Sequence, residues 1–252
     1  MSAVAAVALA VSLVSVMTAC APDPRSVTLS TPIPSASATF SPTPTPIVPT
    51  FNKAAHSIDD PTSIWVVVNK MRPLKPTNFV PDLVAANVPH IFSPTMRTEA
   101  GAALQRMFAA SKAEGGETVQ VQNSYRSFVL QTTIHNRFVA SVGEAAADAQ
   151  SARPGYSEHQ TGFAVDVAAY PSKCDLAACF GETPQGLWLA ANGYRFGFIL
   201  RYPADKTPVT GYIYEPWHFR YVGVELATQM HDTGVTTLEE FFGLPSAPDY
   251  AP

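Results

Sequence analysis

The feature that most constrains this chain is a pair of short segments that carry metal-binding and proton-transfer side chains. The first is Ser157–Asp166, with the sequence SEHQTGFAVD, and the second is Tyr214–His218, with the sequence YEPWH. Together they offer two imidazoles and an aspartate that can close on one divalent metal, and they leave Glu215 over as a base. The fold must therefore bring two distant segments into contact.

The first segment predicts a turn followed by a strand. Side chains alternate along a strand, so Phe163, Val165 and Val167 face the core while Asp166 lies on the open face. His159 then belongs to the preceding turn, where Gly162 supplies the backbone freedom that a sharp turn needs. This arrangement places the imidazole above the end of the strand, near the carboxylate.

The second segment predicts an extended turn that presents a base and a ligand to the same cavity. Pro216 disfavours the helical conformation for Glu215, so Glu215 and His218 can flank one site. Two neutral imidazoles and one carboxylate are a common catalytic zinc set with a fourth position for water. We therefore expect His159, Asp166 and His218 to bind one Zn²⁺ and Glu215 to act as the catalytic base.

Arg126 is the candidate for stabilising negative charge in the transition state. It lies in the sequence Asn123–Ser127 at a predicted strand-to-helix junction. A fixed guanidinium contributes most where an oxyanion develops. The alternative is that Arg126 forms an ion pair at the start of the helix.

Composition excludes nucleic acid as a partner. Charged residues make up only 14% of the 252 residues and the formal net charge is -4, so the chain carries no basic surface for a phosphate backbone. The other histidines, His56, His90, His135 and His231, are scattered and receive no role.

The amino-terminal end predicts export. Residues 1–19 carry no charge and end in small residues before Cys20, which indicates a lipoprotein-type signal peptide with Cys20 as the lipidated residue. An uncleaved membrane anchor is the alternative, because the apolar run approaches spanning length. Either form locates the rest of the chain outside the cytoplasm, attached to the membrane or secreted to the cell wall.

Residues 20–58 predict a disordered linker, followed by a single catalytic domain over 59–252. Within this linker, residues 21–50 hold eight prolines and eleven serines or threonines with only two charges, so they cannot bury enough apolar surface to offset chain entropy.

The two remaining cysteines, Cys174 and Cys179, predict a disulfide. They lie close together in a loop that also contains proline, and the exported location is oxidising. A metal pair is the alternative, but the second pair that such a site needs is absent from the sequence.

The pattern of apolar residues predicts an α+β fold with a largely antiparallel central sheet flanked by helices. A continuous apolar run predicts a buried strand at Ser63–Asn69. A helix is expected to open at Ser93–Thr95 and to bury Leu104, Met107 and Phe108, and a second helix to bury Phe128, Ile134 and Phe138. The further expected strands are 118–124, 163–167 and 196–200, and the further expected helices are 187–192, 222–230 and 236–242.

Four of these segments together resemble the VanY-type zinc D-alanyl-D-alanine carboxypeptidases. They are Ser157–Asp166, Glu215–His218, Ser124–Ser127 with Gln131, and Val68–Leu74. The resemblance extends over roughly residues 60–243 and implies a single zinc peptidase domain.

The resemblance implies roles for the residues of these segments. His159, Asp166 and His218 would bind zinc, Glu215 would be the base and Arg126 would stabilise the transition state. Ser157 and Gln131 would contact the substrate, a peptidoglycan stem peptide cut before its terminal D-alanine. We expect Tyr125 and Trp217 to contact substrate as well, although Trp217 and Tyr214 are equally suited to packing. Glu158 is expected to be a solvated carboxylate at the rim.

Two other functions stay open. The same chemistry would serve an L,D-carboxypeptidase or an endopeptidase, because pocket depth depends on loops such as 143–156 and 170–185. A non-catalytic cell-wall binding protein on the same fold would lack a ligand or the base, and this chain lacks neither.

Overall fold

A computed structural model describes residues 51–251. The predicted signal peptide, Cys20 and the proline-rich residues to position 50 lie outside the described residues. Phe51 stacks on Trp65 and meets Phe241 edge-on, so packed contacts begin before residue 59, inside the range that composition assigns to the linker. No helix within the described range has the length and apolar character required to cross a bilayer.

A four-stranded antiparallel sheet forms the centre of the domain, which confirms the predicted antiparallel character of the sheet but adds a strand at His218–Tyr221 that the sequence analysis did not predict. Its strands are β3 (Val119–Asn123), β4 (Ala164–Ala169), β6 (His218–Tyr221) and β5 (Phe198–Leu200), in that spatial order. A separate two-stranded ladder joins β1 (Val84–Ala85) to β2 (Thr95–Met96).

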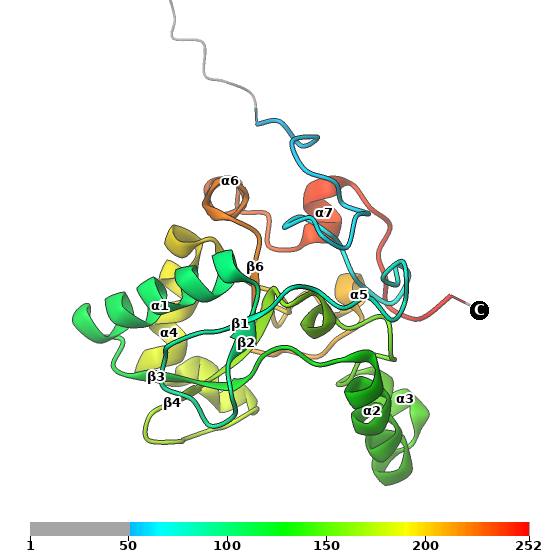
Figure 1. Cartoon of the computed structure of the whole chain (residues 1–252), viewed down its shortest axis with the longest axis horizontal. Helices are drawn as coiled ribbons and strands as arrows, with labels where there is room; N and C mark the ends of the chain where they lie inside the picture. Colours follow the sequence, from blue (N-terminus) through cyan, green and yellow to red (C-terminus); the bar gives the residue numbers. More distant parts are fainter. Residues whose placement is uncertain (1–50, 252) are drawn as a thin grey trace, which may run out of the picture. The chain divides into compact units, whose positions relative to one another are not determined.

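Helices flank the sheet, and α1 and α4 lie on one side of it (Figure 1). The α-helices are α1 (Thr98–Ala113), α2 (Phe128–Val142), α3 (Glu144–Asp148), α4 (Pro184–Asn192), α5 (Thr207–Thr210), α6 (Val224–Thr233) and α7 (Leu238–Phe242). Three short 3₁₀ turns complete the elements: η1 (Glu158–Thr161), η2 (Ala178–Glu182) and η3 (Gly193–Phe196).

The main core lies between the sheet and the two helices α1 and α4. Leu104 and Met107 of α1 are fully buried, as expected, and pack in one cluster with Phe163, Val165 and Leu189. Because neighbouring side chains alternate along a strand, Asp166 lies on the opposite face of β4. The core therefore fixes which face of the sheet carries the site.

The predicted start of the first helix is wrong. Residues Thr95–Met96 form β2, and α1 begins at Thr98. A serine-proline-threonine sequence resembles a helix start, yet the backbone N–H of Thr95 bonds to Ser93 and that of Tyr125 bonds to the carbonyl of Thr95, so this stretch is used for β pairing and turns.

The predicted strand at Ser63–Asn69 is also wrong. Trp65 to Val68 are buried, but they form no ladder with the sheet. The carbonyls of Ile64 and Val66 instead accept hydrogen bonds from the guanidinium of Arg220 at 3.0 and 2.8 Å. An apolar run alone does not distinguish a buried strand from a buried loop whose backbone is satisfied by a side chain.

The predicted disulfide is present, and it joins Cys174, in the loop after β4, to Cys179 in η2. The bond closes a small ring of chain on one side of the site.

Candidate active site

Two strands and one turn bring the three candidate metal ligands together. His159 lies in η1, Asp166 in β4 and His218 at the start of β6. Asp166 and His218 are direct partners in the antiparallel register of β4 and β6. Gly162 adopts the left-handed conformation, with φ of 75°, and turns the chain from η1 into β4 as the sequence indicates.

One donor atom from each of His159, Asp166 and His218 lies within 4.8 Å of the other two. His159 Nε2 is 3.3 Å from Asp166 Oδ2, and His218 Nδ1 is 3.2 Å from Asp166 Oδ1. The two imidazole planes are nearly perpendicular, at 89°. The distances of 3.3 and 3.2 Å between these donor atoms are close to the spacing that three ligands of one small cation require.

The bonding state of these atoms fits a metal. His159 Nε2 and Asp166 Oδ1 are both buried and have no hydrogen-bond partner among residues 51–251. Unpaired buried polar atoms are costly, and a bound cation would satisfy both at once. The donor set of two imidazoles and one carboxylate suits zinc.

The charges around the ligands also favour a cation. Burial and the nearby Arg126 lower the pKa of His159 to about 4, so its imidazole is neutral and free to coordinate. Burial opposes charge on His218, but the carboxylates of Asp166 and Glu158 raise its pKa to about 9. The site thus favours a positive charge at His218, and a metal ion can replace the proton that His218 would otherwise bind.

Glu215 lies beside the three residues. Its Oε2 is 3.7 Å from His218 Nδ1, and a backbone hydrogen bond from His218 to the carbonyl of Glu215 closes the turn between them. Burial raises the pKa of Glu215 to about 8. A cation at the adjacent site would lower this pKa by stabilising the carboxylate, which moves it toward the range useful for proton transfer.

Arg126 lies at the same cleft. Its backbone N–H donates to the carbonyl of His159 at 3.3 Å, which links the start of α2 to the metal-ligand turn. Its Nε is buried and has no hydrogen-bond partner within the described part of the chain. Because Arg126 also lines the cleft, its guanidinium can face an oxygen of a molecule bound there.

These residues line a cleft of about 510 Å³. Its floor includes His159, Asp166, Glu215 and His218. The walls are more apolar and come from α2, the disulfide loop and the segment before β6: Ile134, Phe138, Leu176, Ala177, Ala178, Ile213, Tyr214 and Trp217.

The predicted inward face of α2 is wrong. Phe138 is 38% exposed and lies with Ile134 on the wall of the cleft, whereas the helix buries Gln131 and His135. Gln131 donates to the carbonyl of Ala152 at 2.6 Å, so a polar contact holds the buried face. Apolar periodicity identified the helix but not the side that it buries.

The remaining expected substrate residues occupy different positions. Trp217 lines the cleft and also packs in the main core. Ser157 and Gln131 are buried and Tyr125 is half-buried, and none of the three lines the cleft.

The expectation for Glu158 is wrong. Its side chain is fully buried, not a solvated rim group. Burial alone would raise its pKa, but Arg201 and Arg220 hold the pKa well below its ordinary value, and Glu158 Oε2 lies 3.4 Å from His218 Nε2. The sequence offers no local signal that Glu158 is buried, because the two arginines that pair with it, Arg201 and Arg220, are distant along the chain.

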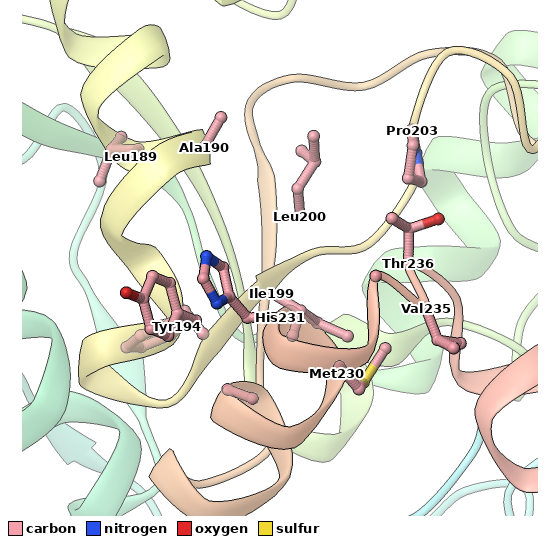
Figure 2. A pocket seen from close by; sticks show the side chains of 13 residues that line it. Leu189, Ala190, Tyr194, Ile199, Leu200, Pro203, Met230, His231, Val235 and Thr236 are labelled. Atoms are coloured by element: carbon pink, nitrogen blue, oxygen red, sulfur yellow. The ribbon is translucent and has the colours of Figure 1, made fainter.

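A second pocket, of about 250 Å³, lies away from the carboxylates and is mainly apolar (Figure 2). Leu189, Ile199 and Met230 are among the side chains that line it. Its imidazole, His231, stacks on Tyr194 with ring centroids 3.7 Å apart. The carboxylate of Asp232 lies 3.1 Å from His231 Nδ1, but the residues that line this pocket include no acidic side chain and no second histidine.

Comparison with known proteins agrees with the site geometry. Residues 93–224 match the VanY family, described as D-alanyl-D-alanine carboxypeptidase. The protein YodJ of Bacillus subtilis (strain 168) is 42% identical over 192 residues, which span 74% of this chain and 69% of YodJ.

Solved structures show the same fold. The LD-carboxypeptidase LdcB superposes with a TM-score of 0.67 and 41% identity, over 74% of this chain and 88% of LdcB. A mutant of the vancomycin resistance D,D-pentapeptidase VanY in complex with Zn(II) superposes with a TM-score of 0.60 and 36% identity, over 71% of this chain and 98% of that one. The zinc in that relative accords with the histidine and aspartate cluster here, which could hold a metal ion. With its fold, its metal-binding cluster and more than half of its length matched, the chain belongs to the VanY family of D-alanyl-D-alanine carboxypeptidases.

Proposed function

We propose that this protein is a zinc carboxypeptidase that hydrolyses the terminal D-alanyl-D-alanine bond of peptidoglycan stem peptides. The observation that carries the proposal is the convergence of His159, Asp166 and His218 in one cleft, with Glu215 and Arg126 beside them. Membership of the VanY family supports the choice of substrate.

In this proposal His159, Asp166 and His218 would hold the zinc ion. When bound, zinc with three protein ligands polarises a carbonyl and lowers the pKa of a coordinated water. The protein contributes the orientation of these ligands, and burial within the cleft limits access of bulk water.

Glu215 carries the proton transfers. Its carboxylate accepts a proton from the attacking water as the new carbon–oxygen bond forms. It then donates that proton to the nitrogen of the leaving D-alanine when the peptide bond breaks. Glu215 Oε2 lies 3.7 Å from His218 Nδ1, next to the proposed metal ligands. This position supports Glu215 as the one group that both accepts the proton from water and donates it to the leaving nitrogen.

Arg126 stabilises the negative charge that develops on the carbonyl oxygen. The buried, unpaired Nε of Arg126 supports this role. We assign Trp217 to the substrate wall from its place in the cleft. Ser157, Gln131 and Tyr125 are proposed as substrate contacts from the family resemblance alone.

An L,D-carboxypeptidase is the second candidate, because LdcB, named as an LD-carboxypeptidase, is 41% identical to this chain. The two activities differ in which peptide is cut. A D,D-carboxypeptidase releases D-alanine from a pentapeptide that ends in D-Ala-D-Ala, whereas an L,D-carboxypeptidase removes the last D-alanine of a tetrapeptide.

The test is digestion of the pentapeptide, the tetrapeptide and cross-linked dimers by the purified zinc-loaded protein, followed by mass analysis. We expect the pentapeptide to lose one alanine and the tetrapeptide to stay intact. Cleavage of the tetrapeptide alone would assign the second activity, and cleavage of cross-linked dimers would assign an endopeptidase. Failure to cut any of them at full zinc occupancy would leave a cell-wall binding protein.

We propose that the enzyme works outside the cytoplasm, because its substrate belongs to the cell wall. In this scheme residues 1–19 are a signal peptide and Cys20 carries the lipid that anchors the protein to the membrane. Labelling with a palmitate analogue tests the anchor, with Cys20→Ala as the control. Equal labelling of both proteins would refute it.

A further inference from the structure

Glu158 belongs to a buried ionic network that reaches from the metal-ligand turn to the last helix. Its Oε1 accepts hydrogen bonds from Arg201 Nε and Arg220 Nη1, each at 2.9 Å. The side chains of all three residues are 0% exposed. A carboxylate buried this deeply persists only when it is paired and hydrogen-bonded.

The second oxygen of Glu158 faces a proposed metal ligand. With Oε1 occupied by two guanidinium groups, Oε2 lies 3.4 Å from Nε2 of His218. Both guanidinium groups that donate to Oε1 are permanently charged and pair with the carboxylate form of Glu158, which can only accept a hydrogen bond. The hydrogen of a neutral His218 must then sit on Nε2, which leaves the lone pair on Nδ1, the atom beside Asp166 and Glu215.

His159 is held in the opposite tautomer by a different group. Its Nδ1 lies 2.6 Å from the carbonyl of Ser124, which can only accept, so the hydrogen sits on Nδ1 and the lone pair on Nε2. One imidazole is thus fixed by a neutral backbone carbonyl and the other by a charged side chain.

The network continues beyond Glu158. Arg201 donates to both oxygens of Glu239 in α7, at 2.7 and 3.0 Å, and Asn69 donates to the same carboxylate at 2.9 Å. Glu239 is 0% exposed and lies outside residues 93–224, the part of the chain that matches the family. Figure 1 draws α7 in the red of the last part of the sequence.

We propose that Glu158 is the positioning residue for His218, and that the Arg201–Glu239 ion pair makes α7 part of the support of the metal site. Arg201 donates hydrogen bonds to the carboxylates of both Glu158 and Glu239. Loss of the charge on Glu239 would let Arg201 move relative to Glu158. Glu158 would then hold the imidazole of His218 less firmly. The proposal rests on the ligand set assigned under the proposed function.

Three variants test the proposal through zinc affinity. Glu158→Gln and Glu239→Gln each remove one charge from the network with little change in size. Glu240→Gln is the matched control, because Glu240 lies next to Glu239 in α7 but pairs with Lys206 near the surface. Zinc dissociation constants are measured by competition with a chromophoric chelator, and ligand orientation by the visible absorption of the Co²⁺-substituted proteins.

We expect Glu158→Gln to weaken zinc binding by about 10- to 100-fold, the usual effect of removing a group that orients a metal ligand, and to alter the Co²⁺ spectrum. Glu239→Gln should weaken zinc binding by a smaller factor and change the Co²⁺ spectrum in the same direction. Glu240→Gln should match wild type in both measurements. A folded Glu158→Gln with wild-type affinity and spectrum overturns the positioning role. Wild-type behaviour of Glu239→Gln overturns the role of α7.

A measurement on the unmutated protein decides the question if Glu158→Gln does not fold. Nitrogen-15 spectra of the zinc-loaded enzyme should show His218 protonated on Nε2 and His159 protonated on Nδ1. A proton on Nδ1 of His218 overturns the proposal. Neither zinc affinity nor tautomer requires turnover, so a failure to release D-alanine would bear on the proposed function and leave this inference to its own test.

Discussion

Replacing Glu215 by glutamine gives the sharpest test of the proposed chemistry. Glutamine keeps the size of the side chain but cannot accept and return a proton. We expect the turnover number to fall by about 10²- to 10⁴-fold, the usual contribution of a positioned general base. Zinc content should not change, because His159, Asp166 and His218 provide the ligand set without Glu215.

The same substitution has a calculable effect on the stability of the zinc-free protein. Burial raises the pKa of Glu215 from 4.5 to about 8. Between these values the unfolded chain releases a proton that the folded protein retains, so the residue destabilises the fold by a growing amount as the pH rises. At about 1.36 kcal/mol per pH unit, the penalty reaches roughly 3 kcal/mol near pH 7 and vanishes below pH 4.

Glutamine does not titrate, so Glu215→Gln should remove this penalty. Urea unfolding of zinc-stripped protein should show the variant gaining roughly 3 kcal/mol relative to wild type on going from about pH 4 to pH 7. Any pH-independent cost of the buried amide cancels in that difference. Glu225→Gln, at an exposed site on α6, is the control. Wild-type turnover in Glu215→Gln would refute the base assignment, and a pH-independent stability difference would refute the raised pKa.

Three further changes probe other parts of the molecule. His218→Ala should lose both zinc and hydrolysis, as measured by metal analysis and D-alanine release, while the exposed His231→Ala should keep both. Arg126→Ala should raise the barrier to hydrolysis by about 2.7 to 4 kcal/mol with zinc affinity unchanged, and normal turnover would contradict its role. Leu104→Ala should cost about 2 to 5 kcal/mol of unfolding free energy, because Leu104 is fully buried in the main core; a smaller loss in urea unfolding would mean that the core closes around the gap.

The sequence was sufficient to predict the α+β fold and the convergence of the metal cluster. Alternation over Phe163–Val167 separates the core face of β4 from the face that carries Asp166, and the proline in the Glu-Pro-Trp-His turn indicates how Glu215 is presented. Both inferences use only local geometry. They succeeded because each depends on neighbours within a few residues.

The errors arose where a distant side chain decides the outcome. Ser63–Asn69 looked like a strand because its apolar run is continuous, but Arg220 satisfies its carbonyls in place of a neighbouring strand. Glu158 looked like a surface group because acidic residues usually are, and only the pairing with Arg201 and Arg220 allows its burial. No local pattern in the sequence encodes these contacts.

The register of β4 and β6 ties the metal cluster to the hydrophobic core. Val165 faces the core and pairs with Phe219, while the next pair along the two strands is Asp166 with His218 on the other face. A slip of one residue would turn an aspartate into the core and a valine toward the cleft, because side chains alternate with a period of two. The core contacts that select this register therefore also select the one alignment in which the two ligands meet. In this protein the packing of apolar side chains sets the position of the proposed metal ligands.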